Sequence, residues 1–103
     1  MIKYTKEELT KILEDHKLWL NDKTTGKKAD LIHTGLSDAI LFKADLRDTN
    51  LIGVNLDGVD LSYAELYKAN MGGVDLICAK LRHADLRYAI LSGVIFTDTR
   101  KEW

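Results

Sequence analysis

Residues 44–71 read ADLRDTNLIGVNLDGVDLSYAELYKANM and contain the pattern that decides the fold. A large apolar residue falls at every fifth position, and a small residue lies two positions before each of them. This register runs from Leu31 to Phe96 without a single insertion. The pattern therefore describes a repeat, and the repeat has to be explained before any single residue.

A period of five does not fit a continuous helix or a flat strand. Five residues advance an α-helix by about 500°, which would spread the large residues around every side. In a flat strand, an odd period sends successive large residues to opposite faces. A chain that turns a corner every five residues solves the problem, because the large residue and the small one two before it then share an inner face. The pattern predicts a solenoid with a ladder of leucines inside.

Several copies of the repeat resemble the A(D/N)LXX unit of the pentapeptide-repeat family, namely residues 29–31, 44–46, 69–71 and 84–86. The resemblance extends from about Ala29 to Thr99. It implies an all-β solenoid, a right-handed quadrilateral parallel β-helix with four repeats in each coil. Small residues twenty positions apart form like columns, such as Ala44, Ala64 and Ala84, which supports four repeats in a coil. The chain would then form about three and a half coils.

The residues before the repeat indicate an amphipathic helix from Thr5 to about Leu20. Thr5 and Glu8 have the spacing of a capping box. The apolar stripe consists of Leu9, Ile12, Leu13, His16, Trp19 and Leu20. We expect this helix to cap the first coil, because the open end of a repeat stack needs a cover. The chain is thus divided into a cap and linker (1–28), the β-helix (29–100) and a tail (101–103).

Composition limits the classes of function. The chain of 103 residues has 15 basic and 16 acidic residues and a net charge of −1, which makes nucleic-acid binding improbable because such binding needs a basic excess. The single cysteine, Cys78, excludes an intrachain disulfide. No apolar run approaches the length of a membrane span, and the N-terminus lacks the apolar stretch of a signal peptide. We expect a cytoplasmic protein.

No group of residues predicts catalysis. His16, His33 and His83 lack the spacing of a metal site, and no His or Asp neighbours Cys78, which we expect to be an exposed thiol. Gly53 and its equivalents Gly73 and Gly93 fall at one corner, where glycine suits the positive φ of a type II turn. The sequence predicts no catalytic, cofactor-binding or metal site, and hence no enzyme.

One outward column contains Asp45, Glu65 and Asp85, and the column two residues on contains Arg47, Tyr67 and Arg87. We expect a solvated, salt-bridged face there. Exposed aromatic residues beside arginines are typical of protein interfaces, although aromatics also stack along sheets and cover backbone. The candidate interaction surface consists of Phe42, Tyr63, Tyr67, Arg82, Arg87 and Tyr88.

These observations favour a non-enzymatic interaction module with an unidentified protein partner. The family resemblance implies an alternative, a DNA mimic that binds a type II topoisomerase (gyrase) and confers quinolone protection, which would need a continuous negative stripe. A second candidate surface is the apolar C-terminal end, with Ile90, Leu91, Ile95, Phe96 and Trp103. An uncovered apolar end predicts a two-fold homodimer, unless the tail folds back over the last coil and leaves a monomer.

Overall fold

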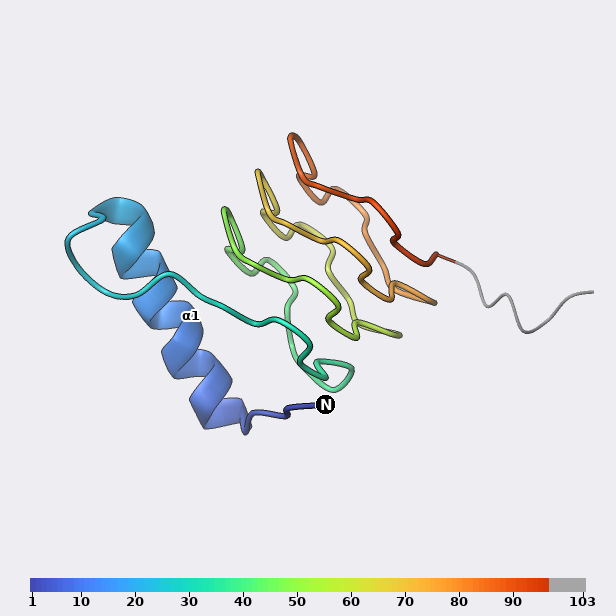
Figure 1. Ribbon diagram of the computed structural model, residues 1–103, viewed down its shortest axis with the longest axis horizontal. Helices are drawn as coiled ribbons and strands as arrows, with labels where there is room; N and C mark the ends of the chain where they lie inside the picture. Colours follow the sequence, from blue (N-terminus) through green and yellow to red (C-terminus); the bar gives the residue numbers. More distant parts are fainter. Residues whose placement is uncertain (97–103) are drawn as a thin grey trace, which may run out of the picture.

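The computed structural model of this chain describes residues 1–96, in which one helix, α1 (Lys6–Asn21), precedes a stack of coils (Figure 1). The predicted helix is confirmed within one residue at each end. Its capping box is present, since the Thr5 hydroxyl accepts from the Glu8 N–H (3.0 Å) and the Glu8 carboxylate accepts from the Thr5 N–H (2.8 Å). These bonds satisfy two N–H groups that a helix start otherwise leaves free.

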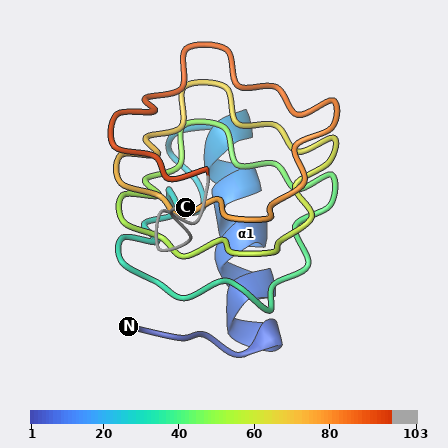
Figure 2. The same ribbon diagram turned by 90° about the vertical axis from the view of Figure 1, so that its right-hand side faces the viewer.

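Successive coils pair through residues twenty positions apart. Asn50 pairs in parallel with Asn70, and Asp45 with Glu65. Four pentapeptides therefore complete one turn, and Figure 2 shows the resulting four-sided outline. We call the small residue, the next residue and the leucine of each repeat a wall, and the two residues that follow a corner. Where a wall pairs with the next coil, it does so through its central residue alone, so the described chain has isolated bridges where we expected strands.

The main chain explains why the coils stack. The Leu51 N–H donates to the Asn70 carbonyl (2.8 Å), and the Asn70 N–H donates to the Thr49 carbonyl (3.0 Å). The Val54 N–H donates to the Leu51 carbonyl (3.1 Å) and closes the corner between two walls. A central residue such as Asn70 thus directs both main-chain groups to the preceding coil. Every coil depends on its neighbour for these hydrogen bonds.

The Asp or Asn before the leucine has a local role. The side chains of Asn55, Asp60 and Asp75 each accept a hydrogen bond of 2.9 Å from the N–H two residues later, within the corner. This Asx interaction stabilises a turn without help from another coil. The predicted positive φ is confirmed at Gly53 (67°), but Tyr63 (61°) and Cys78 (60°) adopt it too, so the corner does not require glycine.

The predicted leucine ladder forms the core. Leu31, Leu36, Leu41, Leu46, Leu51, Leu56, Leu61, Leu66, Met71 and Leu76 are each at most 3% exposed. Each such burial contributes about 1.5–3 kcal/mol before entropy is counted. The ladder opens toward its end, where Leu91 is 38% and Phe96 55% exposed.

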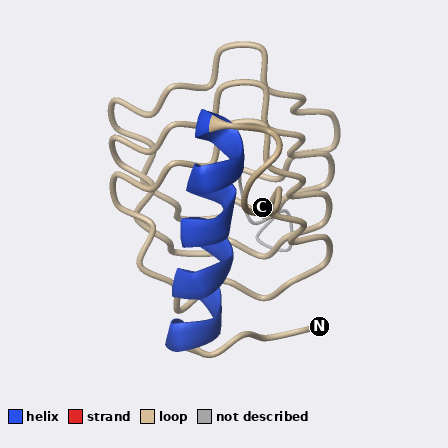
Figure 3. Cartoon of the chain, turned by 90° about the vertical axis from the view of Figure 1, so that its left-hand side faces the viewer, coloured by secondary structure: helices blue, strands red, loops and turns tan. Residues whose placement is uncertain are grey.

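Helix α1 lies across the N-terminal end of the coils (Figures 1 and 3). Leu9 is buried in the core, and Ile12 and Leu13 pack against it. The segment before α1 extends the ladder at one wall, because Ile2 pairs in parallel with Thr34 and its carbonyl accepts from the Gly35 N–H (2.8 Å). Helix and segment together replace part of a preceding coil.

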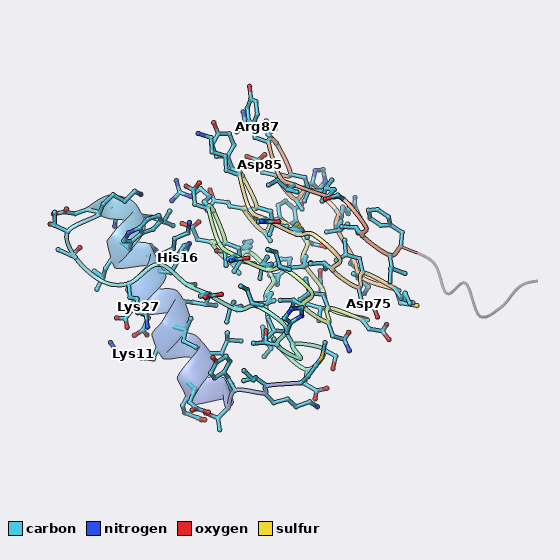
Figure 4. All side chains as sticks on the ribbon, viewed as in Figure 1. Lys11, His16, Lys27, Asp75, Asp85 and Arg87 are labelled. Atoms are coloured by element: carbon cyan, nitrogen blue, oxygen red, sulfur yellow. The ribbon has the colours of Figure 1, made fainter. Side chains whose placement is uncertain are left out.

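His16 completes this replacement in a way that the sequence did not predict. Its imidazole is fully buried and points from α1 toward the coils (Figure 4). Nδ1 accepts from the Ala29 N–H (2.9 Å), which leaves the proton on Nε2, and Nε2 donates to the Arg47 carbonyl (2.6 Å). One coil later, the equivalent carbonyl of Tyr67 accepts from the N–H of Asp48 (3.0 Å). The imidazole therefore substitutes for a peptide group of a missing coil.

The state of His16 leads to a prediction about pH. Burial lowers the pKa of His16 below its ordinary 6.5, although the Arg47 carbonyl and the nearby Asp45 and Asp48 oppose the shift. The unfolded chain then binds the proton more tightly, so the free energy of unfolding should be greatest above about pH 6.5 and fall as the pH drops below it. Urea unfolding at pH 7 and pH 5 measures this difference.

The control is His16→Gln, whose amide can accept and donate without titrating. We expect a much smaller difference between pH 7 and pH 5 in this variant. The same decline in both proteins would show that His16 is not responsible.

Candidate interaction surface

One side of the solenoid gathers the aromatic and basic residues. It consists of the stacked walls 44–46, 64–66 and 84–86 and the two columns of corners beside them. Corners 42–43, 62–63 and 82–83 form one border, and corners 47–48, 67–68 and 87–88 form the other. The bridges between Asp45, Glu65 and Asp85 hold these walls in register. We call this surface the aromatic wall.

The first border is a column of rings. Phe42 meets Tyr63 edge to face, with ring centroids 5.8 Å apart, and Tyr63 stacks on His83 at 5.0 Å. The Lys43 ammonium lies 5.4 Å from the centre of the Phe42 ring. Such contacts stabilise rings beyond the burial of their area, so this column is organised before any partner arrives.

The second border pairs rings with cations. Tyr67 and Tyr88 meet edge to face at 5.5 Å. Lys68 and the guanidinium of Arg87 each lie 5.4 Å from the centre of the Tyr67 ring. Tyr88 is 76% exposed, so its ring remains accessible at the end of this column.

Two ion pairs occupy the space between the borders. Arg47 forms a fork on Asp45 (2.8 and 2.7 Å), and Arg87 forms the same fork on Asp85 (2.9 and 2.9 Å; Figure 4). The predicted salt-bridged column is confirmed for these pairs. Glu65 lies between them in the column and is exposed, because Tyr67 holds the position of the arginine in its repeat.

The forks change the pKa of their carboxyl groups. Burial alone would raise the pKa of Asp45, but the hydrogen bonds from Arg47 lower it below its ordinary value. The hydrogen bonds from Arg87 likewise lower the pKa of Asp85. Both carboxylates are therefore ionised at neutral pH and hold their arginines in fixed orientations.

The structure brings the predicted surface residues together. Phe42, Tyr63 and Tyr88 are between 46% and 76% exposed, and Tyr67 is half-buried. Arg82 is exposed beside His83. His83 also belongs to this surface and was not predicted, although its position twenty residues after Tyr63 places it in the same column.

The second predicted surface is exposed as well. In the last part of the described chain, Ile90 is 51%, Leu91 38%, Ile95 43% and Phe96 55% exposed. Trp103, the fifth residue of this group, lies outside the described residues.

The other candidate residues stay apart. Within residues 1–96, no three His, Cys, Asp or Glu side chains come close enough to hold a metal ion. Cys78 is exposed and free, as expected. Over the same residues, no helix has the length and apolar character to cross a membrane.

The two forks allow a matched comparison. The side chains of Asp45 and Arg47 are 16% and 41% exposed, whereas those of Asp85 and Arg87 are 31% and 74% exposed. Solvent screens the outer pair more strongly, so Asp45→Asn should lower the urea midpoint at pH 7 more than Asp85→Asn does. The loss should fade as the pH falls through the lowered pKa of each carboxyl in the wild type. An equal loss in the two variants would contradict this ranking.

Comparison with known proteins places these features in a family. The family described as pentapeptide repeats matches residues 39–77 and 75–100, in eight copies. A pentapeptide repeat protein (Rfr23) from the cyanobacterium Cyanothece 51142 is 35% identical, with a TM-score of 0.54. The match covers 73% of this chain and 47% of Rfr23, so the chain spans about half the length of that protein.

Two other solved structures are similar in sequence. The pentapeptide repeat protein alr5209 from Nostoc Pcc 7120 is 31% identical over 70% of this chain and 77% of its own, with a TM-score of 0.43. QnrB1, a plasmid-mediated fluoroquinolone resistance protein, is 27% identical over 70% of this chain and 39% of its own, with a TM-score of 0.25. No protein with a curated description matches. The repeats and the match to Rfr23 show that the chain belongs to the pentapeptide-repeat family.

Proposed function

We propose that this chain is a non-enzymatic interaction module that binds a protein partner through the aromatic wall. We also propose that its coils are right-handed, as the family resemblance implies. The observation that carries the proposal is the pair of ring columns beside the fixed Asp–Arg forks. Exposed tyrosines and arginines on a rigid support are the residues that most often dominate binding energy at protein interfaces. Their order in the free protein reduces the entropy lost on binding.

The charge of this surface argues against a DNA mimic. Lys43, Lys68 and Arg82 are basic groups on its borders, while Asp45 and Asp85 are neutralised by arginines. A DNA mimic of the kind that binds gyrase needs a continuous negative stripe. Here basic groups flank the acidic column on both sides and neutralise two of its carboxylates, so we place the mimic second.

The wall can be tested with paired variants. We expect a double variant, Tyr63→Ala with Tyr88→Ala, to lose at least tenfold in the capture of a specific protein from host extract, because truncation of central aromatics removes the main contacts. The control is Ile52→Ala with Ile77→Ala, at corners that do not border the aromatic wall. Quantitative mass spectrometry of the captured proteins measures the loss, and circular dichroism verifies folding. Equal capture by the two variants would refute the aromatic wall as the binding surface.

We further propose that two copies associate through the C-terminal coil. Ile90, Leu91, Ile95 and Phe96 present apolar surface there. Apolar surface at the edge of a ladder promotes association, and a two-fold contact closes without further growth.

Sedimentation at micromolar concentration tests the dimer. We expect the wild type to sediment as a dimer and Phe96→Asp as a monomer, because the charge would be buried without a partner. Phe42→Asp, on the aromatic wall, should remain dimeric. A wild-type monomer, or a dimer that survives Phe96→Asp, would exclude this interface.

A further inference from the structure

The first coil, residues 29–48, departs from the others at its wall 39–41. At the corner before the equivalent walls, Gly58 and Cys78 have positive φ (72° and 60°), whereas Asp38 does not. Asp60 pairs with Lys80 in the following coil, but within residues 1–96 no bridge joins Ile40 to Asp60. Ile40 is 77% exposed. The first coil therefore separates from the second at this one wall.

The same wall lacks a neighbour on its other side. The Ile2 carbonyl accepts a hydrogen bond from the Gly35 N–H. The His16 imidazole accepts one from the Ala29 N–H and donates one to the Arg47 carbonyl. Between these two substitutes lie walls 39–41 and 44–46. In later coils, the central residue of a wall bonds to the preceding coil through both N–H and C=O, as Glu65 does with Ala44 and Leu46. The corresponding groups of Ile40 and Asp45 have no main-chain partner within the described chain.

A trough lies along α1 over these two walls. Beside the first wall it is a cavity of about 280 Å³, lined by Leu9, Leu13, Leu36, Ala39 and Ile40 among others. Beside the second wall it is bounded by Glu14, Lys17, Lys43, Asp45 and Arg47. Thr10 and Leu13 line both parts, so the two parts adjoin on the same flank of α1.

We propose that this trough binds an extended peptide segment of a partner protein, which supplies the two missing walls. Its main chain would pair in parallel with Ile40 and Asp45, as every coil pairs with the next, and an aliphatic side chain would enter the cavity. Addition of a strand to a free edge, with a pocket for a side chain, is an established mode of peptide recognition. A purely aliphatic small molecule would fill the cavity but leave the row of N–H and C=O groups unpaired, so a peptide fits the site better.

The register defines a probe. Two walls and their corners take ten residues of this chain, for example 79–88, AKLRHADLRY. We place the peptide where a coil before the first coil would lie. The N–H groups of the peptide's two leucines, which correspond to Leu81 and Leu86, would then donate to the carbonyls of Ile40 and Asp45 in the protein. The matched control peptide is methylated on those two backbone nitrogens, which removes both donors and keeps every side chain.

The test measures binding of the synthetic peptide to the full chain by changes in the amide resonances of Ile40 and Asp45. We expect saturable binding, with at least a tenfold weaker affinity for the methylated peptide. Thr10→Trp, which fills the trough from α1, should abolish binding, and Lys11→Trp, one residue on along the same helix, should preserve it. The melting temperature of each variant verifies folding.

Three results would overturn the proposal. They are the absence of binding to the wild type at millimolar peptide, equal affinities for the two peptides, and binding that Thr10→Trp leaves unchanged. The last result would place the peptide at another edge of the solenoid. None of these outcomes depends on the aromatic wall, so this site and the proposed function succeed or fail separately.

Discussion

The main-chain hydrogen bonds that pair each wall with the wall twenty positions away are the interaction on which the rest of the structure depends. They fix the coil at four repeats, and that closure places every fifth leucine inside. They also have a direction, because the central residue of nearly every wall after the first coil turns both main-chain groups toward the preceding coil. A coil without a predecessor is left with unpaired groups at an edge, which attracts other chains. The first coil therefore needs other groups to pair with its free main-chain N–H and C=O groups.

Two local elements cover the first coil. The segment before α1 pairs with one wall, and the apolar face of α1 covers the leucines. A helix cannot continue the ladder, because its own backbone groups are used within it. A side chain with a donor and an acceptor can do so, and the neutral imidazole of His16 has both. The apolar face of the helix thus covers the N-terminal end of the core, but the helix satisfies main-chain groups of the first coil only where His16 reaches them.

Much of this fold could be predicted because it follows from local and periodic signals. The leucine ladder, the capping box at Thr5 and the fork of Asp45 with Arg47 all depend on spacings within a few residues or on the period of twenty. The role of His16 could not be predicted, because it depends on how α1 sits on the coils. The position of a histidine in the apolar stripe of a helix predicts that it is partly buried, but it does not predict its hydrogen-bond partners.

The departure at wall 39–41 also escaped the sequence analysis, since the register of the repeat is unbroken there. Ile40 stands where most repeats have Asp, Asn or Glu, but this difference does not explain the departure, because Ile90 stands at the same position and still pairs with Asn70 of the preceding coil. Residues 1–96 form isolated bridges in place of strands for a local reason, because a corner every five residues leaves three residues for each wall. For the candidate surface, the period was sufficient to group the aromatic residues and also places His83 in the column of Tyr63, but only the structure shows that the two rings stack.

The internal use of polar groups narrows where recognition can take place. Asp30, Asp60 and Asp75 cap their own corners, and Asp45 and Asp85 in addition hold arginines. These carboxylates are oriented by the repeat itself and are poorly placed to meet a partner's groups. What remains are rings and cations on the aromatic wall and the main-chain edge beside α1. We propose that the first meets the side chains of a folded partner and the second an extended segment, both separate from the apolar contact proposed at the C-terminal coil.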